Sequence, residues 1–507
     1  MKTKSTSKLE NSADLDASSS LKHTYDLTVI GTGPAGLYAA VQGAKLGKKV
    51  AIVEKDPRRL GGAWIHTGTL PSKTLRESVA SIASIRFHVG ADWMLRVTNQ
   101  LANGSIFQRA QRVSMTEEET IKRHIESNKI KFIQGQAYLE DRYTVRCIRE
   151  DATCELIHTD KVFIATGSRP RRPSDIPFDG WRVIDSDEIL SLQYIPKEML
   201  IFGAGVVGCE YACIFSALGV KVTLVDARSK ILQMLDQEIV RELQRSMETL
   251  GVKFILGQPL GQMAFDGPRV VAEIGQEKIS SDLFVYTAGR VSNTDRLGLE
   301  RIGVEVNERG AIKVNDCFQT AVHSIYAGGD AIGPPALAAT STEQGRLAIR
   351  HAFGLHDKKF PSFFPIGVYT IPELSCAGKN EEELIAEGIE YVVGKAFFSE
   401  VARGNIQGDN AGLLKLLVAP KSQKLLGIHI VGEGACNLIH IGMAFMLKGG
   451  HVQDLVNMIF NYPTLAESYR IAAFNALNKI FKDGNFQDPE TEVLISSQNS
   501  KEFKRSA

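Results

Sequence analysis

The stretch YDLTVIGTGPAG, residues 25–36, decides the fold of the first part of the chain. A short apolar run, Tyr25–Ile30, leads directly into a glycine-rich turn, and a helical pattern follows as far as Gly47. A second β-rich run, residues 49–53, delivers Glu54, which lies 18 residues after the last glycine of the turn. The glycines of the turn are Gly31, Gly33 and Gly36.

This order of elements suits the chemistry of a dinucleotide. Glycines let the backbone approach a pyrophosphate at the N-terminus of a helix, and a carboxylate accepts hydrogen bonds from ribose hydroxyls. A glycine pattern alone is a weak signal, but here a strand, a helix and an acidic residue accompany it. We therefore predict a dinucleotide-binding strand–turn–helix rather than an incidental tight turn.

The same pattern occurs a second time in MLIFGAGVVG, residues 199–208. A predicted helix over residues 210–218 and a predicted strand over residues 221–225 follow, and Asp226 again lies 18 residues after the last glycine. The glycines of this turn are Gly203, Gly205 and Gly208. Two fingerprints with equal spacing predict two bound dinucleotides.

The residues after the second fingerprint bear on the choice of nucleotide. Asp226 favours the free 2′-hydroxyl of NAD, whereas Arg228 with Lys230 could bind the 2′-phosphate of NADP. The alternative is that both cations are merely solvated. The presence of a carboxylate and two cations together favours a site that accepts both nucleotides.

Length and composition exclude several classes of function. With 44% hydrophobic and 23% charged residues, a chain of 507 residues is expected to form roughly two to four globular domains. The formal net charge of +1 argues against a nucleic-acid binder, and no run approaches the roughly 18 apolar residues of a membrane span. The seven cysteines lack metal-ligand spacing, so we expect scattered reduced thiols and no metal site. The polar N-terminal segment resembles neither a signal nor a transit peptide, which predicts a cytoplasmic protein.

A third stretch, GGAWIHTGTLPSK at residues 61–73, resembles a signature of the FAD-dependent pyridine nucleotide-disulfide oxidoreductases. In that family the stretch reads Gly-Gly-x-Cys-x-Asn-x-Gly-Cys-x-Pro-Ser-Lys, and its two cysteines form the redox disulfide beside the flavin. Here Trp64 and Thr69 occupy the two cysteine positions. A disulfide needs two sulfurs at a limited separation, so this chain cannot run disulfide chemistry there. The scaffold remains, and a helix is expected from Pro71.

The end of the chain departs from the family at one further position. The segment NYPTLAE, residues 461–467, matches the family's His-Pro-Thr-x-x-Glu at the proline, the threonine and Glu467, but Tyr462 replaces the catalytic histidine. Tyrosine is a poor base near neutrality because its ordinary pKa is about 10. The transhydrogenase branch of the family likewise has tyrosine at this position and threonine at that of Thr69.

The resemblance implies roles for residues throughout the chain. Lys73 and Glu210 match a family pair that lies near flavin N5 beside the nicotinamide, and Asp330 matches an aspartate that binds the ribityl chain. A helix over residues 336–352 would then direct its N-terminus toward the flavin. The implied catalytic residues are Lys73, Glu210, Tyr462 and Glu467. The further implied cofactor-binding residues are Lys55, Gly61, Gly62, Thr69, Thr166, Gly167, Gly289, Asp330 and Ala338.

The resemblance also implies the fold class, which is α/β with two Rossmann-like dinucleotide-binding domains, for FAD and NAD(P), and a C-terminal α+β dimerisation domain. In chain order we expect a disordered tail (1–24), the first part of the FAD domain (25–175), the NAD(P) domain (176–292), the second part of the FAD domain (293–360), the dimerisation domain (361–483) and a frayed tail (484–507). Antiparallel strands are expected over residues 130–163, and further strands over residues 413–418 and 425–431. A homodimer is implied because in this family the segment around Tyr462 comes from the partner subunit.

The function that we expect is transhydrogenation, in which bound FAD passes a hydride between NADPH/NADP and NADH/NAD. Trp64 would then cover the flavin face on which the disulfide normally lies and would exclude thiols and oxygen. Two alternatives stay open. One is an NAD(P)H diaphorase or quinone reductase of the same fold, and the other is a non-catalytic redox sensor that binds FAD and NAD(H). The retained Lys73 and Glu210 argue against the sensor.

Overall fold

The computed structural model of the chain describes residues 24–89, 105–192, 194–355, 359–408 and 411–481. The tails expected for residues 1–24 and 484–507 lie outside these ranges, except for Thr24. The chain forms two compact units. The first unit comprises residues 1–62, 118–168 and 292–360, and the second comprises residues 63–117, 169–291 and 361–507. The finer domain limits expected from the sequence stay a prediction.

The first unit is built on a seven-stranded sheet in the order β3-β2-β1-β6-β5-β4, with β17 paired to β6. Its strands are β1 (Tyr25–Ile30), β2 (Val50–Glu54), β3 (Lys131–Gln134), β4 (Gln136–Asp141), β5 (Thr144–Ile148), β6 (Cys154–Ile164) and β17 (Ile325–Ala327). The first predicted strand is confirmed to the residue. Strands β1, β2, β3 and β17 and the end of β6 run parallel, as expected of a Rossmann-like sheet.

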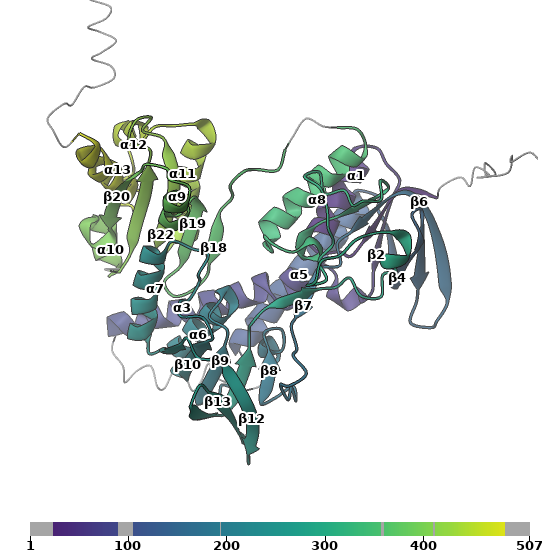
Figure 1. The fold of residues 1–507 in the computed structure, drawn as a ribbon, viewed down its shortest axis with the longest axis horizontal. Helices are drawn as coiled ribbons and strands as arrows, with labels where there is room; N and C mark the ends of the chain where they lie inside the picture. The colour runs from purple at the N-terminus through teal and green to yellow at the C-terminus, as the bar shows by residue number, and fades with distance from the viewer. Residues whose placement is uncertain (1–23, 90–104, 193, 356–358, 409–410, 482–507) are drawn as a thin grey trace, which may run out of the picture. The chain divides into compact units, whose positions relative to one another are not determined.

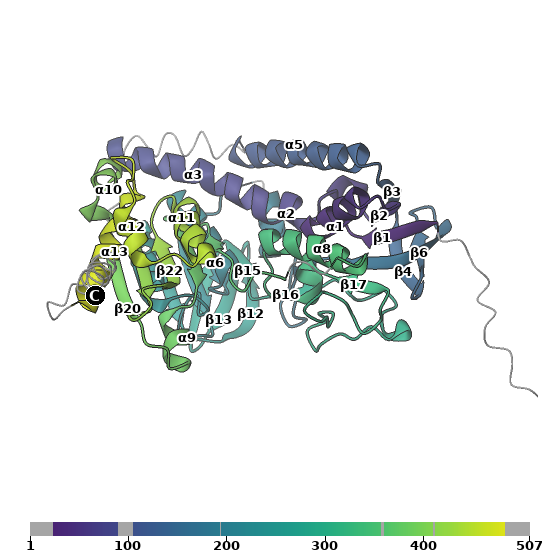
Figure 2. The ribbon, with the colours of Figure 1, turned by 90° about the horizontal axis from the view of Figure 1, so that it is seen from above.

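The antiparallel strands predicted for residues 130–163 are confirmed for β4, β5 and β6. The prediction is wrong for β3, which pairs parallel to β2. The long connection from β2 ends in helix α5 (Ser105–Ser127) and brings the chain back to the same end of the sheet. Helices α1 (Pro34–Lys45) and α8 (Ala338–Ala352) lie side by side against this sheet (Figures 1 and 2).

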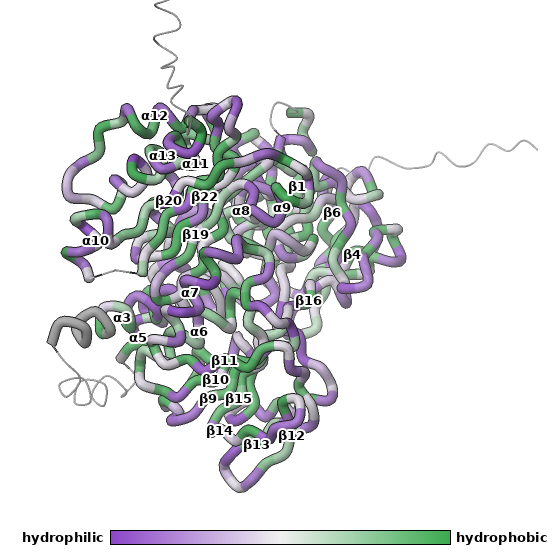
Figure 3. Tube along the Cα trace, turned by 60° about the vertical axis from the view of Figure 1, so that its left-hand side comes forward, coloured by the Kyte–Doolittle hydropathy of each residue, from purple (hydrophilic) through white to green (hydrophobic). Residues whose placement is uncertain are grey.

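The second unit contains an all-parallel sheet in the order β11-β10-β9-β15-β8. Its strands are β8 (Val183–Asp185), β9 (Glu198–Phe202), β10 (Lys221–Asp226), β11 (Lys253–Leu256) and β15 (Leu283–Tyr286). Figure 3 shows β9, β10 and β15 as hydrophobic segments, and such continuous apolar strands are typical of a parallel sheet covered on both faces. Helices α6 (Val206–Ala217) and α7 (Gln237–Leu250) follow β9 and β10, and a small antiparallel sheet is formed by β12 (Leu260–Asp266), β13 (Arg269–Ile274) and β14 (Glu277–Ser281).

The second unit also contains an antiparallel sheet in the order β18-β19-β22-β21-β20. Its strands are β18 (Ile366–Val368), β19 (Leu374–Gly378), β20 (Val392–Phe397), β21 (Leu413–Val418) and β22 (Leu425–Val431), and its helices are α9 (Glu381–Ala386), α10 (Ala402–Gln407), α11 (Ala435–Lys448), α12 (Val452–Asn457) and α13 (Glu467–Ile480). Strands β21 and β22 confirm the two strands predicted from the sequence. The Tyr469 hydroxyl donates to the Leu438 carbonyl at 2.8 Å and so joins α13 to α11 over this sheet.

Helices α2 (Ala63–His66) and α3 (Thr69–Val89) complete the second unit. Three predicted helices begin at other residues than expected: α3 begins at Thr69 rather than Pro71, α6 at Val206 rather than residue 210, and α8 at Ala338 rather than residue 336. In α6 the reason is that Gly205 is itself the N-cap, so the helix follows the turn directly. Within the described ranges, no helix is both long and apolar enough to cross a membrane.

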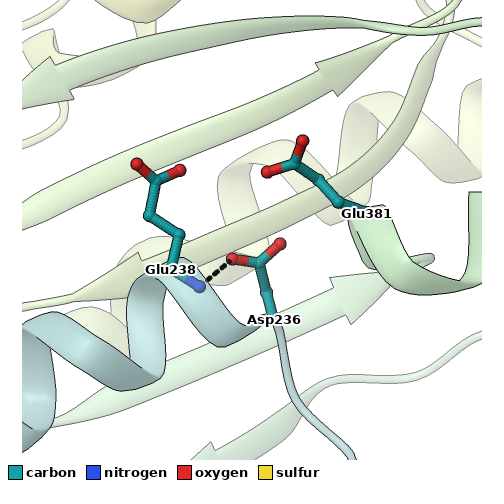
Figure 4. Close-up of side chains that lie close together, drawn as sticks. All are labelled: Asp236, Glu238 and Glu381. Carbon is teal, nitrogen blue, oxygen red and sulfur yellow. Dashed lines mark hydrogen bonds between the residues drawn. The ribbon is translucent and has the colours of Figure 1, made fainter. Parts of the chain in front are cut away.

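A buried cluster of charged residues joins α7 to the antiparallel sheet. The carboxylates of Asp236, Glu238 and Glu381 face a common space (Figure 4) and are close enough together to suit a metal ion. In the folded chain the Lys415 ammonium takes that place: its Nζ lies 2.9 Å from both Asp236 oxygens and 3.1 Å from Glu238, and it also pairs with Glu381. The cluster is therefore satisfied by a lysine.

The two innermost members of the cluster are held in their charged forms. Lys415 is 0% exposed and Asp236 is 1% exposed. Burial alone would raise the pKa of Asp236, but the charges and hydrogen bonds around it, including those of Lys415, hold this pKa below its ordinary value. Burial alone would lower the pKa of Lys415, but hydrogen bonds to Glu381 and Asp236 hold it above its ordinary value.

We expect Lys415→Met to destabilise the fold by about 3–5 kcal/mol, because it leaves the buried Asp236 carboxylate without its cation. Lys395→Met is the matched control: Lys395 pairs with Glu238 but its side chain is 30% exposed, so its loss should cost at most about 1 kcal/mol. Urea denaturation followed by circular dichroism measures both. Equal shifts of the two unfolding curves would contradict this account of the cluster.

Candidate functional site

The first glycine-rich turn has the geometry of a phosphate-binding loop. A Cβ added to Gly36 would lie 2.0 Å from the Gly31 carbonyl oxygen, so only glycine allows α1 to approach β1 this closely. A Cβ added to Gly33 would contact only the Gly61 carbonyl oxygen, at 3.9 Å. The space beside the N-terminus of α1 is therefore open, and backbone N–H groups at a helix N-terminus attract a phosphate there.

Glu54 is held in place at the end of β2. Its Oε2 accepts hydrogen bonds from the Thr32 backbone N–H at 3.1 Å and from the Thr32 hydroxyl at 2.5 Å, and its Oε1 accepts from Asp56 N–H at 3.2 Å. The Thr32 hydroxyl oxygen also accepts from Gly61 N–H at 2.9 Å, which ties the Gly61-Gly62 turn to the first fingerprint. The carboxylate is thus oriented beside the loop, as a ribose acceptor requires. Lys55 follows it and is exposed.

The other predicted cofactor residues of the first unit lie after β6 and around β17. The Thr166 hydroxyl is buried and has no hydrogen-bond partner among the described residues, and Gly167 follows it. Asp330, in the short 3-10 helix Gly329–Ile332, accepts a hydrogen bond from the Ser168 hydroxyl at 2.6 Å. Ala338 is the first residue of α8. A buried hydroxyl without a partner, an open phosphate-binding turn and an oriented carboxylate fit a dinucleotide such as FAD.

The second fingerprint repeats the geometry of the first. A Cβ added to Gly208 would lie 1.8 Å from the Gly203 carbonyl oxygen, whereas one added to Gly205 would meet no atom within 4 Å. Asp226 Oδ2 accepts a hydrogen bond from Ala204 N–H at 2.6 Å, just as Glu54 accepts from Thr32 N–H. Gly289 follows β15, and a Cβ there would also meet no atom within 4 Å. These residues fit a second dinucleotide.

Arg228 has a partner that the sequence did not reveal. Its Nε donates to Asp226 Oδ1 at 2.9 Å and its Nη2 donates to Oδ2 at 2.7 Å, a bidentate ion pair. Burial alone would raise the pKa of Asp226, but the hydrogen bonds from Arg228 and Ala204 hold it below the ordinary value. Arg228 is thus ion-paired, whereas Lys230 is exposed, and the part of these two cations in nucleotide choice stays a prediction.

Lys73 and Glu210 are brought together by α3 and α6, although they lie 137 positions apart in the sequence. Lys73 Nζ donates to Glu210 Oε1 at 2.8 Å and to Oε2 at 2.7 Å. The Glu210 side chain is 5% exposed and that of Lys73 is 25% exposed. Tyr369 completes the group: its N–H donates to Glu210 Oε1 at 2.9 Å, and its ring centroid lies 5.0 Å from Lys73 Nζ. The contact of Lys73 with Glu210 was expected, but the part of Tyr369 was missed.

No sulfur lies at the two positions where the family has its redox cysteines. Thr69 is exposed at the start of α3, and Trp64, in α2, is half-buried. The indole N–H of Trp64 and the hydroxyl of Thr67 are buried and have no hydrogen-bond partner among the described residues. All seven cysteines are free thiols, and burial raises the pKa of Cys213 to about 12, which makes it unreactive.

Tyr462 and Glu467 lie at the other end of the second unit's sequence. Tyr462 is 76% exposed, and Ile459, three residues earlier, is 90% exposed. Glu467 begins α13 and accepts a hydrogen bond from Thr464 N–H at 3.5 Å. Such exposed large side chains are typical of a surface that a partner covers. The roles of all these predicted site residues stay a prediction.

Comparison with protein families identifies the group to which this geometry belongs. The model of the pyridine nucleotide-disulphide oxidoreductases matches residues 25–345, and that of their dimerisation domain matches residues 364–473. The chain belongs to this family. The family uses FAD and NAD(P), which agrees with the two fingerprints, and the expected fold class is confirmed.

Named relatives lie within the same family. The soluble pyridine nucleotide transhydrogenase of Mycobacterium tuberculosis is 44% identical over 463 residues, which are 90% of this chain and 98% of the relative. That of Pseudomonas aeruginosa is 41% identical over 467 residues, 90% of this chain and 99% of the relative. Among solved structures, the HOCl-induced flavoprotein disulfide reductase RclA of Escherichia coli superposes with a TM-score of 0.79 at 27% identity, covering 88% of this chain and 98% of its own. LpdA of Mycobacterium tuberculosis, with a TM-score of 0.82 at 24% identity, covers 88% of this chain and 99% of its own and shares the fold.

We expect Thr166→Val to weaken FAD retention about three- to tenfold, because it removes a buried hydroxyl that has no other partner. Thr28→Val is the matched control, since the Thr28 hydroxyl is also buried and without a partner but lies within β1. Fluorescence titration of the apoproteins with FAD measures both dissociation constants. The same loss of affinity in the two variants would contradict a contact between Thr166 and the cofactor.

Proposed function

We propose that this protein is a FAD-dependent pyridine nucleotide transhydrogenase, which catalyses NADPH + NAD⁺ ⇌ NADP⁺ + NADH. One hydride changes carrier and no net proton is released. The observation that carries the proposal is that the Lys73–Glu210 pair and both fingerprints are complete, whereas positions 64 and 69 hold no sulfur. The naming of relatives that are 41–44% identical over 90% of the chain supports it.

The chain's own residues bind and orient the reactants. When bound, FAD supplies the chemistry, because it accepts a hydride from one nicotinamide nucleotide and passes it to another. The turn around Gly33 and the carboxylate of Glu54 would hold FAD, and the turn around Gly205 with Asp226 would hold the nicotinamide nucleotide. Because one nucleotide site serves both substrates, the first product leaves before the second substrate binds, which is a ping-pong order.

The Lys73–Glu210 pair would supply fixed charge beside the nicotinamide. Glu210 is nearly fully buried and takes three hydrogen bonds, two from Lys73 and one from Tyr369, so neither charge moves freely. Such a preorganised pair orients a reactant without reorganising during the reaction.

The residues at the family's cysteine and histidine positions also support transhydrogenation. Trp64 and Thr69 cannot accept electrons as a disulfide does, and Tyr462 lacks the proton affinity of a catalytic histidine near neutrality. Hydride transfer between nucleotides needs neither group. Disulfide reduction by the family's route is thereby excluded for this chain.

The Asp226–Arg228 pair suits a site that must accept two nucleotides. Asp226 can accept a hydrogen bond from the 2′-hydroxyl of NAD, and the guanidinium beside it can bind the 2′-phosphate of NADP. A transhydrogenase needs both options, because NAD and NADP bind in turn.

The assembly and the location complete the proposal. The match to the dimerisation domain supports a homodimer, and Tyr462 with the exposed residues near it would lie at its interface. We place the protein in the cytoplasm, because relatives that are 42–44% identical over 90% of the chain are named as soluble.

Steady-state kinetics tests the proposal. With NADPH as donor and oxidised thionicotinamide adenine dinucleotide as acceptor, we expect saturable reduction of the acceptor and parallel lines in double-reciprocal plots, as a ping-pong order requires. A quinone serves as the competing acceptor. Saturable turnover with the quinone and none with the second nucleotide would overturn the proposal in favour of a diaphorase.

Arg228→Gln tests the role of the ion pair in nucleotide choice. We expect the KM for NADPH to rise about tenfold and that for NADH to change less than about threefold, since only NADPH carries the 2′-phosphate. Lys253→Gln, which removes an exposed charge from β11, is the matched control and should leave both constants unchanged. An equal rise for both nucleotides in Arg228→Gln would contradict the assignment.

A further inference from the structure

The segment between β18 and β19 is fastened to helices α3 and α6. At its start, the Tyr369 N–H donates to Glu210 Oε1 at 2.9 Å. One residue later, the Thr370 carbonyl accepts from Arg76 Nε at 3.1 Å. At its end, Glu373 lies 3.4 Å from Arg76 Nη1. The segment Tyr369–Glu373 therefore has three polar anchors outside its own sheet.

Two side chains that contact this segment, Lys73 and Arg76, project from the same face of α3. Lys73 and Arg76 are three residues apart, so their side chains are neighbours on the helix surface. Arg76 is 2% exposed and also donates to Glu433 at 2.8 Å, which fixes the guanidinium. The position of Lys73 relative to Tyr369 is thus determined by a second, buried contact one helical turn away.

The Tyr369 ring completes the surroundings of the Lys73 ammonium. An ammonium has three N–H donors, and Lys73 directs two hydrogen bonds to the oxygens of Glu210. The ring face, 5.0 Å from Nζ, attracts the cation on another side. Unlike a second carboxylate, an aromatic face does not compete with Glu210 for those hydrogen bonds.

The Tyr369 phenol stays protonated, so it provides an aromatic surface and does not act as an acid or base. Burial, with the neighbouring Cys436 and Glu373, raises the pKa of Tyr369 to about 12, so the phenol is neutral at physiological pH. Cys436 lies at the start of α11, and its side chain is directed to the Leu374 carbonyl at 3.8 Å.

We propose that Tyr369 is a positioning residue for hydride transfer: its ring and its backbone N–H together hold Lys73 and Glu210 in the geometry that the reaction uses. This role rests on the proposed function. It assigns a part of the redox site to the region that matches the dimerisation domain, which neither the glycine fingerprints nor the family's redox positions indicate.

The test compares Tyr369→Leu and Tyr369→Phe in the FAD-loaded protein, with NADPH as the only nucleotide. Stopped-flow absorbance gives the rate of flavin reduction at saturating NADPH and the dissociation constant for NADPH. We expect Tyr369→Leu to slow reduction about tenfold with less than about a twofold change in the dissociation constant, and Tyr369→Phe to stay within about twofold of the parent in both. Tyr391→Leu, at a half-buried tyrosine bonded to Glu381, is the matched control with no expected effect on either constant.

A double-mutant cycle separates positioning from general packing. If Tyr369 acts through Lys73, then Tyr369→Leu adds less than about a twofold further loss to Lys73→Met. An equal loss in both backgrounds, or a Tyr369→Leu protein that reduces at the parent rate, overturns the proposal. Should the leucine variant fail to retain FAD, Tyr369→Met enters the same cycle.

Failure of this proposal and failure of the proposed function give different results. The rates above need no second nucleotide, so they test Tyr369 even if reduced protein cannot pass a hydride to NAD⁺. A reduced protein that cannot pass a hydride to NAD⁺ would overturn the proposed transhydrogenation but not the role of Tyr369.

Discussion

The close approach of a helix to the end of a β-strand is the constraint on which both nucleotide sites depend. In each fingerprint the third glycine brings its helix against the carbonyl oxygen of the first, at positions where a methyl group would overlap that oxygen. The middle glycine then faces open space, and the backbone N–H of the residue before it donates to a carboxylate, Glu54 or Asp226. One local geometry, used twice, therefore provides for two dinucleotides in one chain.

Two buried charges of the second unit, Glu210 and Lys415, are stabilised by partners from segments distant in sequence. Glu210 is held by Lys73 and by the Tyr369 backbone, and Lys415 by three carboxylates. Buried charges are costly without such compensation. Because Tyr369 follows β18, the C-terminal sheet supplies one of the hydrogen bonds that hold Glu210.

Hydrophobic pattern and turn chemistry sufficed to predict the elements that local sequence determines. Strands β1, β21 and β22 were predicted to the residue because each is a clear apolar run between turn residues. The parallel pairing of β3 was missed because it depends on the path of a long connection. The bidentate Arg228–Asp226 pair, the Lys415 cluster and the contacts of Tyr369 were missed because they depend on side-chain geometry, or on contacts across as many as 179 positions in the sequence, which no local pattern encodes.

A double-mixing stopped-flow experiment without oxygen tests the central claim, transfer of a hydride between two nicotinamide nucleotides through bound FAD. The protein is first mixed with one equivalent of NADPH until the flavin absorbance near 450 nm, about the usual band of the oxidised ring, has been lost, and then with excess NAD⁺. Our account predicts that this absorbance returns within the turnover time while NADH forms in equal amount. Flavin that NADPH reduces but NAD⁺ cannot reoxidise would contradict it.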